Sequence, residues 1–253
     1  MPDTERDPRP VPPHAPLTRY YDADPQRHRY VIDLFDRTAQ HYNTIERIFG
    51  NGGLWYRRFS LRRAGLRPGM RVLDVAIGTA AVARGAVRLG ARVFGVDPSA
   101  GMLRQARENF RGPLARGVAE ALPFRSESFD FVTMGIALRH VSDLKATFHE
   151  YHRVLRPGGT LWILESHVPR SRLGHWLTRL LWARVIPGLT LLSTRSRDAK
   201  LLMDYYWDTV EQCVPPETIV EAMRSAGFDP ARSKVVVPGS FCEYTGRRPL
   251  AVR

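Results

Sequence analysis

Apolar positions follow two different spacings along the chain, and the switch between them predicts strands and helices in turn. Two short apolar runs, 71–74 and 92–96, are typical of buried parallel strands, and carboxylates end them at Asp74 and Asp97. The segment 81–89 between them is rich in Ala and Arg, which favours a helix. We therefore predict one strand–helix–strand unit with an acid at the tip of its second strand.

The same alternation continues towards the end of the chain, with short turns that contain Gly and Pro between the segments. It predicts further helices at 100–109, 143–155 and 215–225, and further strands at 114–118, 129–134, 160–164, 234–237 and 241–245. Repeated strand–helix units with short connections indicate an α/β fold. We expect a doubly wound parallel sheet that holds its ligand at the carboxyl ends of the strands.

The N-terminal part of the chain has a different composition. Residues 1–27 contain seven prolines and few large apolar side chains, which predicts a disordered or weakly ordered tail. From Tyr30 onward, apolar residues recur at helical spacing and predict a first helix, and 54–64 predicts a second helix with an arginine-rich face. Residues 28–253 are expected to form one domain.

The loop after the first strand indicates the class of ligand. A dinucleotide-binding loop needs three glycines so that the backbone can approach a pyrophosphate, but this loop has only Gly78 between Ala76 and Ala80. Asp97 stands where a carboxylate can accept both hydroxyls of a ribose. A ligand with an adenosine ribose and no phosphate fits both features, and S-adenosylmethionine is the common one. The alternative is a purely structural unit with an empty crevice.

Composition narrows the class of protein further. The chain has 253 residues, a formal charge of +13 and only two cysteines, Cys213 and Cys242, which cannot build a disulfide framework or a zinc site. No metal is therefore expected, and a reducing, cytoplasmic setting fits. The arginines are scattered, so we interpret them as a solvated basic surface and expect no nucleic acid, while weak association with a membrane surface stays open.

Five segments together resemble a known family. They are VLDVAIGT, FGVDPSAGML, AEALPF, SFDFVTMGIALRH and YHRVLRPGGTLWILE. In this order they resemble the class I S-adenosylmethionine-dependent methyltransferases, and more narrowly the ubiquinone/menaquinone-biosynthesis C-methyltransferase family. The resemblance implies a Rossmann-like, doubly wound seven-stranded sheet with a reversed last strand, and it implies S-adenosylmethionine as the cofactor.

The resemblance also implies a set of cofactor-binding residues. Tyr42 would reach the methionine carboxylate, Asp97 the ribose hydroxyls, and Ala119 the adenine. The full set is Tyr42, Asp74, Ala76, Gly78, Thr79, Asp97, Pro98, Met102, Val118, Ala119, Glu120 and Gly135. Ala80 stands where the family has Gly, so its Cβ is expected to crowd the methionine end of the cofactor.

The long stretch 166–216 is rich in large apolar side chains and exceeds an ordinary connection. We predict two helices that form a helical lid over the cofactor and line a site for an apolar acceptor. The candidate substrate-binding residues are Trp176, Tyr205, Tyr206 and Trp207. The alternative for most of them is that they pack the lid onto the sheet.

Methyl transfer to an acceptor also calls for removal of a proton, and two histidines are placed to do this. His140 follows the fourth predicted strand and His167 the fifth, so either could be the catalytic base. The expected function is C- or O-methylation of a small aromatic, quinol-like or polyketide-like acceptor. The alternatives are an RNA methyltransferase and a methyltransferase fold that uses bound cofactor for a non-methylating reaction. A homodimer stays open.

Overall fold

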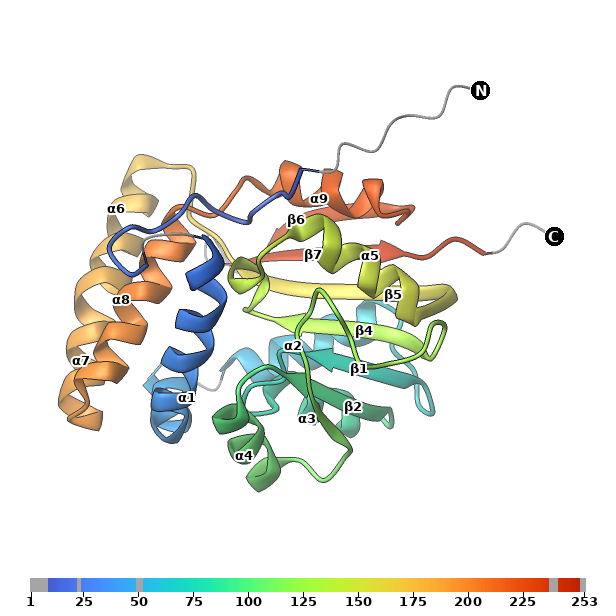
Figure 1. Cartoon of the computed structure of the whole chain (residues 1–253), viewed down its shortest axis with the longest axis horizontal. Coiled ribbons are helices and arrows are strands. Elements are labelled where there is room, and N and C mark those ends of the chain that lie inside the picture. Colours follow the sequence, from blue (N-terminus) through green and yellow to red (C-terminus); the bar gives the residue numbers. More distant parts are fainter. Residues whose placement is uncertain (1–8, 22–23, 49–51, 237–240, 251–253) are drawn as a thin grey trace.

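A seven-stranded sheet is the centre of the structure, which is a computed structural model that describes residues 9–21, 24–48, 52–236 and 241–250 (Figure 1). Its strands are ordered β3-β2-β1-β4-β5-β7-β6. Their bounds are β1 Arg71–Val75, β2 Arg92–Asp97, β3 Leu114–Arg116, β4 Phe129–Gly135, β5 Leu155–Ser166, β6 Ala231–Val236 and β7 Phe241–Arg247. β7 pairs antiparallel with β5 and β6, whereas the other pairs are parallel. The predicted sheet with a reversed last strand is confirmed.

Helices cover both faces of the sheet because successive strand residues point to opposite sides. Val72 of β1 packs in a core with α2 (Gly52–Arg63), α3 (Ala81–Arg88) and α4 (Ala100–Asn109). Leu73 faces the other core, under α5 (Leu144–Val154) and α9 (Pro216–Ser225). The two layers leave the carboxyl ends of β1, β2 and β4 at one edge, where a crevice can form.

The remaining helices form a cap beside that edge (Figure 1). It consists of α1 (Asp24–Ile48), α6 (Arg172–Leu180), a π-helical turn η2 (Leu181–Val185), α7 (Ile186–Thr194) and α8 (Arg197–Glu211). α6, η2 and α7 follow one another without a break, so the stretch 166–216 holds two helical rods. Leu34 of α1 and Leu202 of α8 belong to a third apolar core inside the cap.

The N-terminal segment differs from its predicted disorder. Leu17 and Tyr21 are each only 5% exposed and join the core of the cap. The backbone of Val11 bonds to the Asp143 carboxylate and accepts from the Leu144 N–H. Residues 9–21 therefore pack on the fold, with Leu17 and Tyr21 as apolar anchors, where a disordered or weakly ordered tail was expected. Residues 1–8 and 22–23 lie outside the described part of the chain.

Two element boundaries also differ from prediction. α1 begins at Asp24 rather than near Tyr30. β5 begins at Leu155, which was predicted as the last residue of a helix, and it includes 156–159, where a turn was expected. It begins this early because Leu155 pairs with Phe129 before a register shift in the ladder. Val237, the predicted end of the sixth strand, lies outside the described residues.

Candidate functional site

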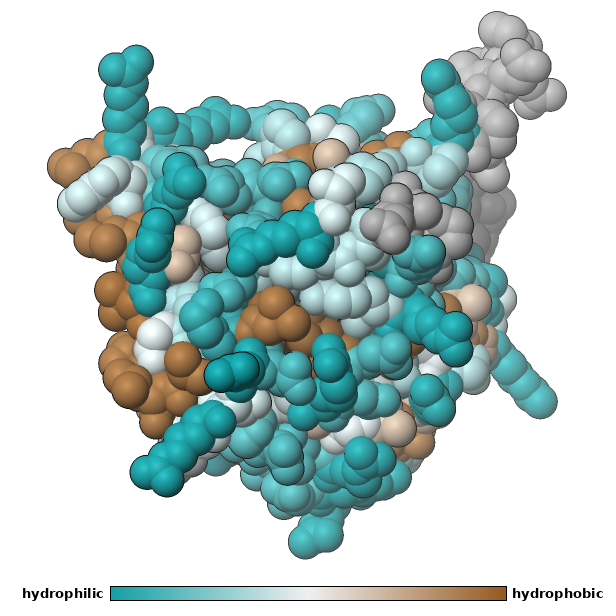
Figure 2. All heavy atoms as spheres, turned by 60° about the vertical axis from the view of Figure 1, so that its left-hand side comes forward, coloured by the Kyte–Doolittle hydropathy of each residue, from teal (hydrophilic) through white to brown (hydrophobic). Residues whose placement is uncertain are grey.

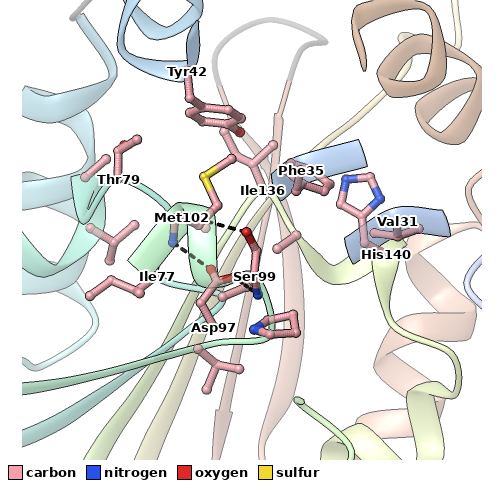
Figure 3. Close-up of a pocket in the computed structure, with 18 of the residues that line it drawn as sticks. Val31, Phe35, Tyr42, Ile77, Thr79, Asp97, Ser99, Met102, Ile136 and His140 are labelled. Atoms are coloured by element: carbon pink, nitrogen blue, oxygen red, sulfur yellow. Dashed lines mark hydrogen bonds between the residues drawn. The ribbon is translucent and has the colours of Figure 1, made fainter. Parts of the chain in front are cut away.

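A cavity of about 360 Å³ opens at the carboxyl ends of β1, β2 and β4 (Figure 3). The sheet contributes Asp74, Asp97 and Gly135 to its wall, and the cap covers it with residues of α1, η2 and α8. Gly135 is needed there, since a Cβ at this position would lie 2.7 Å from Val82 of α3. The cavity is therefore at the switch point where doubly wound folds bind their ligands.

Asp97 holds the loop that precedes α3. Its two carboxylate oxygens accept the N–H groups of Gly78 and Ser99, each at 2.9 Å. Burial raises the pKa of Asp97 to about 6, although these two hydrogen bonds act in the opposite direction. Each oxygen keeps a second lone pair, so the carboxylate can also accept the two hydroxyls of a ribose.

Asp74 connects elements of the fold, because both of its oxygens accept hydrogen bonds from neighbouring elements. One oxygen accepts from the hydroxyl of Thr133 at 2.7 Å, and the other accepts from the N–H of Ala83 at 3.0 Å. Burial raises the pKa of Asp74 to about 7. Asp74 thus ties β1 to β4 and to the start of α3 while it lines the cavity.

The loop between these two acids contains two alanines in the left-handed region, Ala76 at φ 52° and Ala80 at φ 68°. Ala80 is fully buried in the core under α2 and α3 and does not line the cavity. The structure therefore places the Ala80 Cβ in the core rather than beside the cavity, in contrast to the crowding expected from the sequence. The hydroxyl of Thr79 is buried without a hydrogen-bond partner and lines the cavity.

α1 closes the cavity from above, with Tyr42 over Met102 in Figure 3. Asp36 fixes this helix on α4, because its Oδ1 accepts from the hydroxyl of Ser99 at 2.5 Å and from the N–H of Gly101 at 2.7 Å. The Cβ of a residue at position 101 would lie 3.0 Å from the Ala39 Cβ. The glycine allows this close approach.

All twelve predicted cofactor-binding residues line this one cavity. Val118, Ala119 and Glu120 follow β3, and the Glu120 carboxylate accepts from the N–H of Ser142 at 2.5 Å. Pro98 lies beside Asp97, on the same side. The structure gathers these residues from five separate segments around a space that fits an adenosine-bearing ligand.

His140 lines the far side of the cavity, next to Val31 and Phe35 (Figure 3). Its ring stacks on Tyr205 at 5.6 Å and meets the edge of Phe35 at 5.3 Å. Both ring nitrogens are buried and have no hydrogen-bond partner. Burial, together with the nearby charge of Arg139, lowers the pKa of His140 well below its usual range. The imidazole is therefore neutral at pH 7 and free to bond a ligand.

A buried ion pair supports the His140 loop. Arg139 and Glu165 are each 1% exposed, and Nη1 of Arg139 lies 2.6 Å from Oε1 of Glu165. Nη1 also donates to the carbonyl of Ile136, which has φ 59°, a strained conformation for a β-branched residue. The guanidinium lies 3.9 Å above the ring of Tyr206. Glu165 therefore has a structural role, because it fixes this loop through Arg139.

Of the residues predicted to act on the substrate, only His140 and Tyr206 line the cavity. His167 is half-buried outside it. Trp176 is 58% exposed, and Tyr205 and Trp207 are buried in the packing of α8. Neighbours on a helix are rotated by about 100°, so Tyr205 and Tyr206 face different surroundings. These four residues, His167, Trp176, Tyr205 and Trp207, therefore do not line the cavity, in contrast to the placement expected from the sequence.

The sequence interpretation missed several charged and apolar lining residues. Arg57 of α2 and Arg84 of α3 line the cavity, and the Nε of each is buried without a partner. Glu46 lies on α1 one turn after Tyr42, a helical spacing that could have indicated it. Trp182 of η2 stacks on Tyr206 at 5.0 Å, and it was expected only as part of an apolar lid.

Within the described residues, no helix combines the length and apolar character needed to cross a bilayer. Among the same residues, no group of three or more His, Cys, Asp or Glu side chains could hold a metal ion.

Comparison with known proteins gives consistent matches. A methyltransferase domain family matches residues 73–163. A demethylmenaquinone methyltransferase of Symbiobacterium thermophilum is 31% identical over 88% of this chain and 94% of its own length. The ubiquinone/menaquinone biosynthesis C-methyltransferase UbiE of Shewanella halifaxensis is 31% identical over 85% of this chain and 89% of its own.

Solved structures share the fold at lower identity. A phosphoethanolamine N-methyltransferase 2 of Haemonchus contortus, solved with phosphomonomethylethanolamine and S-adenosylhomocysteine, has a TM-score of 0.63 and 20% identity. The match covers 86% of this chain and 60% of that longer chain.

Proposed function

The chain belongs to the family of demethylmenaquinone and ubiquinone/menaquinone biosynthesis C-methyltransferases, and from this premise we propose that it methylates a small, largely apolar, quinol-like aromatic ring. Membership confirms the predicted class, an S-adenosylmethionine-dependent methyltransferase that acts on small molecules. The acceptor itself, and transfer to carbon rather than oxygen, are the proposed part.

The cofactor half of the cavity fits S-adenosylmethionine, which when bound supplies an electrophilic methyl group on a sulfonium. Asp97 would accept the ribose hydroxyls, and Ala119 and Val118 would flank the adenine. The unpartnered hydroxyl of Thr79 is available to a polar group of the ligand. Thr79 therefore has a hydrogen bond to gain from ligand binding.

Arg57 would neutralise the carboxylate of the methionine moiety. Its charge acts on Asp74 and Tyr42, which lie on the same side of the cavity, and it has no ion pair in the described part of the chain. Arg84 lies on the neighbouring helix, also with an unpartnered Nε. Two unpaired arginines in a partly closed cavity favour an anionic group between them.

The observation that carries the acceptor proposal is the apolar half of the same cavity. Its wall is built from Val31, Ile32, Phe35, Ile45, Leu181, Trp182, Met203, Tyr206 and Phe241. Trp182 and Tyr206 stack with their ring planes at 7° and present a flat aromatic surface. A planar apolar ring would bury its faces here and exclude water from the transfer.

His140 is the polar group that meets this apolar half. As a neutral imidazole it can accept the proton of a ring hydroxyl, which makes the neighbouring ring carbon more nucleophilic. Burial lowers the pKa of His140, but the positive charge that develops on its imidazole during proton transfer would be stabilised by the phenolate that forms beside it. We assign His140 to orient the acceptor hydroxyl and take its proton.

The test is turnover of the purified protein with S-adenosylmethionine and a short-chain demethylmenaquinol, with product mass and position of the methyl group as readouts. We expect a product with one added methyl group on a ring carbon. A polar catechol of similar size is the control acceptor and should be methylated far more slowly. Methylation of oxygen would correct the regiochemistry. Binding of the cofactor without turnover of either ring would overturn the acceptor class.

The role of His140 is tested with His140→Asn, which keeps a polar side chain of smaller size. We expect kcat to fall about a hundredfold, within the range for loss of a general base, while cofactor affinity is unchanged. Thr147→Val is the control, because it removes a different buried polar group without a hydrogen-bond partner, the Thr147 hydroxyl, which lies outside the cavity. Full turnover by His140→Asn would refute the base. The RNA-methylating and non-methylating alternatives have no specific observation in their favour.

A further inference from the structure

The outer side of the long cap rod, residues 172–194, is an exposed apolar surface. Its side chains recur three or four positions apart and so share one side of the helix. They are Leu173, Trp176, Leu177, Leu180, Leu181, Val185, Leu189 and Leu192, all between 42% and 77% exposed. Figure 2 shows apolar side chains gathered on this side of the molecule with hydrophilic ones around them. We call these eight residues the rod face.

The charged side chains of the rod segment itself have one sign. Residues 166–197 include six arginines and neither Asp nor Glu. Two of the six are paired, Arg170 with Glu217 at 2.8 Å and Arg179 with Glu211 at 4.0 Å. The other four, Arg172, Arg184, Arg195 and Arg197, are exposed and have no ion pair within the described residues.

The rod face is continuous with the cavity. Leu181 is 46% exposed on the rod face and also lines the cavity, and Trp182, the next residue, stacks inside it on Tyr206. An apolar path therefore leads from the outer surface of the cap to the apolar half of the site. The rod is about 34 Å long at 1.5 Å per residue, which suits a helix that lies along a surface.

We propose that the rod face docks on an anionic lipid bilayer, with the rod parallel to the membrane plane. The apolar side chains would enter the boundary between headgroups and acyl chains, and the unpaired arginines would contact anionic headgroups. A second copy of the chain fits less well, because two rod faces brought together would also bring together two sets of unpaired arginines. Docking would also let an apolar acceptor enter the cavity from the bilayer. This second step rests on the proposed function, whereas docking itself does not.

The experiment is co-sedimentation of the full chain with vesicles. Vesicles of phosphatidylcholine and phosphatidylglycerol should bind the protein, and vesicles of phosphatidylcholine alone should bind it far more weakly. Leu177→Asp combined with Leu192→Asp should weaken binding about tenfold or more, because both side chains would enter the bilayer. Arg172→Glu combined with Arg184→Glu should weaken vesicle binding at least about fivefold per arginine at low salt. This effect should disappear at high salt, because salt screens the attraction between arginines and headgroups.

Matched controls use exposed residues away from the rod. Val235→Asp is the apolar control, at 51% exposure on β6, and Arg104→Glu with Arg111→Glu is the charge control. Cofactor binding by calorimetry verifies that each variant is folded, independently of any acceptor. Docking is overturned if the unaltered protein stays in the supernatant or if the rod variants sediment as well as the controls. A dimer that dissociates in Leu177→Asp/Leu192→Asp while vesicle binding persists would assign the rod face to a second copy instead.

Discussion

The carboxylate of Asp97 accepts the N–H of Gly78 at 2.9 Å, across 19 positions of the chain. The acid that we propose to bind the ribose therefore also holds the loop that precedes α3. Because Ser99 donates to the other oxygen, the carboxylate is fixed in orientation before any ligand arrives. A group that is already oriented loses little conformational entropy on binding, which favours affinity.

Replacing Asp97 by Ala should weaken binding of S-adenosylmethionine about a hundredfold. The change removes two charge-assisted hydrogen bonds to the ribose, worth about 1.5–3 kcal/mol each, and frees the loop at Gly78. Calorimetric titration measures the effect. Asp33→Ala is the control, since Asp33 is an exposed carboxylate on the same side of the fold that does not line the cavity. Equal affinities for the two variants would contradict the assignment.

Cofactor binding should depend on pH through Asp97. Burial raises the pKa of this group to about 6 in the free protein, and only the ionised form accepts both hydroxyls. Affinity should therefore fall as the pH drops through 6 and be about tenfold weaker near pH 5 than above pH 7. Asp97→Asn should bind weakly with a much flatter pH profile. A steep profile in Asp97→Asn would point instead to Asp74, whose pKa is raised to about 7.

The buried pair behind the His140 loop should matter mainly for stability. Arg139→Met would leave Glu165 charged and unpaired at 1% exposure, which should cost about 3–5 kcal/mol of unfolding free energy. Arg139→Met combined with Glu165→Gln should recover much of that loss, because no uncompensated charge remains. Urea denaturation of the two single variants and the double variant measures the coupling. Additive losses of unfolding free energy would show that Arg139 and Glu165 contribute independently.

The sequence was sufficient where local signals and packing agree. α4 was predicted at its observed bounds, 100–109, and the hydroxyl of Ser99 caps this helix by accepting from the Met102 N–H at 3.0 Å. β1 and β2 were predicted because strands buried on both faces are continuously apolar. Asp97 follows from that placement, since the end of the second strand fixes where its carboxylate lies.

The rest depends on packing between distant segments. Leu17 and Tyr21 were not distinguished from a disordered tail, because their partners lie in the cap, far along the chain. Tyr205 and Tyr206 are adjacent in sequence and alike in chemistry, yet only Tyr206 lines the cavity. Arg57 looked like one of many surface arginines, and only the closure of α2 over the crevice places it at the site.

Ala80→Gly tests whether the alanine in the loop affects the cofactor. Glycine would relieve the left-handed conformation at φ 68° but would lose a buried methyl group and gain entropy in the unfolded chain. These effects oppose each other, so the unfolding free energy should change by less than about 1 kcal/mol. Cofactor affinity should stay within about twofold, since the methyl group packs in the core. A large gain in affinity would show that the methyl group does crowd the ligand.

Trp182→Ala should separate acceptor binding from cofactor binding. Trp182 stacks on Tyr206 in the apolar half of the cavity, so its removal takes away one face of the aromatic surface that the acceptor would contact. We expect KM for a water-soluble short-chain quinol to rise about tenfold, because one aromatic contact and its buried area are lost.

Trp176→Ala on the same rod is the matched control, since Trp176 is 58% exposed outside the cavity and its loss should leave this KM unchanged. Affinity for S-adenosylmethionine should be the same in both variants, because neither residue belongs to the set that we expect to bind the cofactor. An equal rise in KM for the two variants would mean that the acceptor contacts the outer rod rather than the cavity, and the position of the acceptor site would have to be revised.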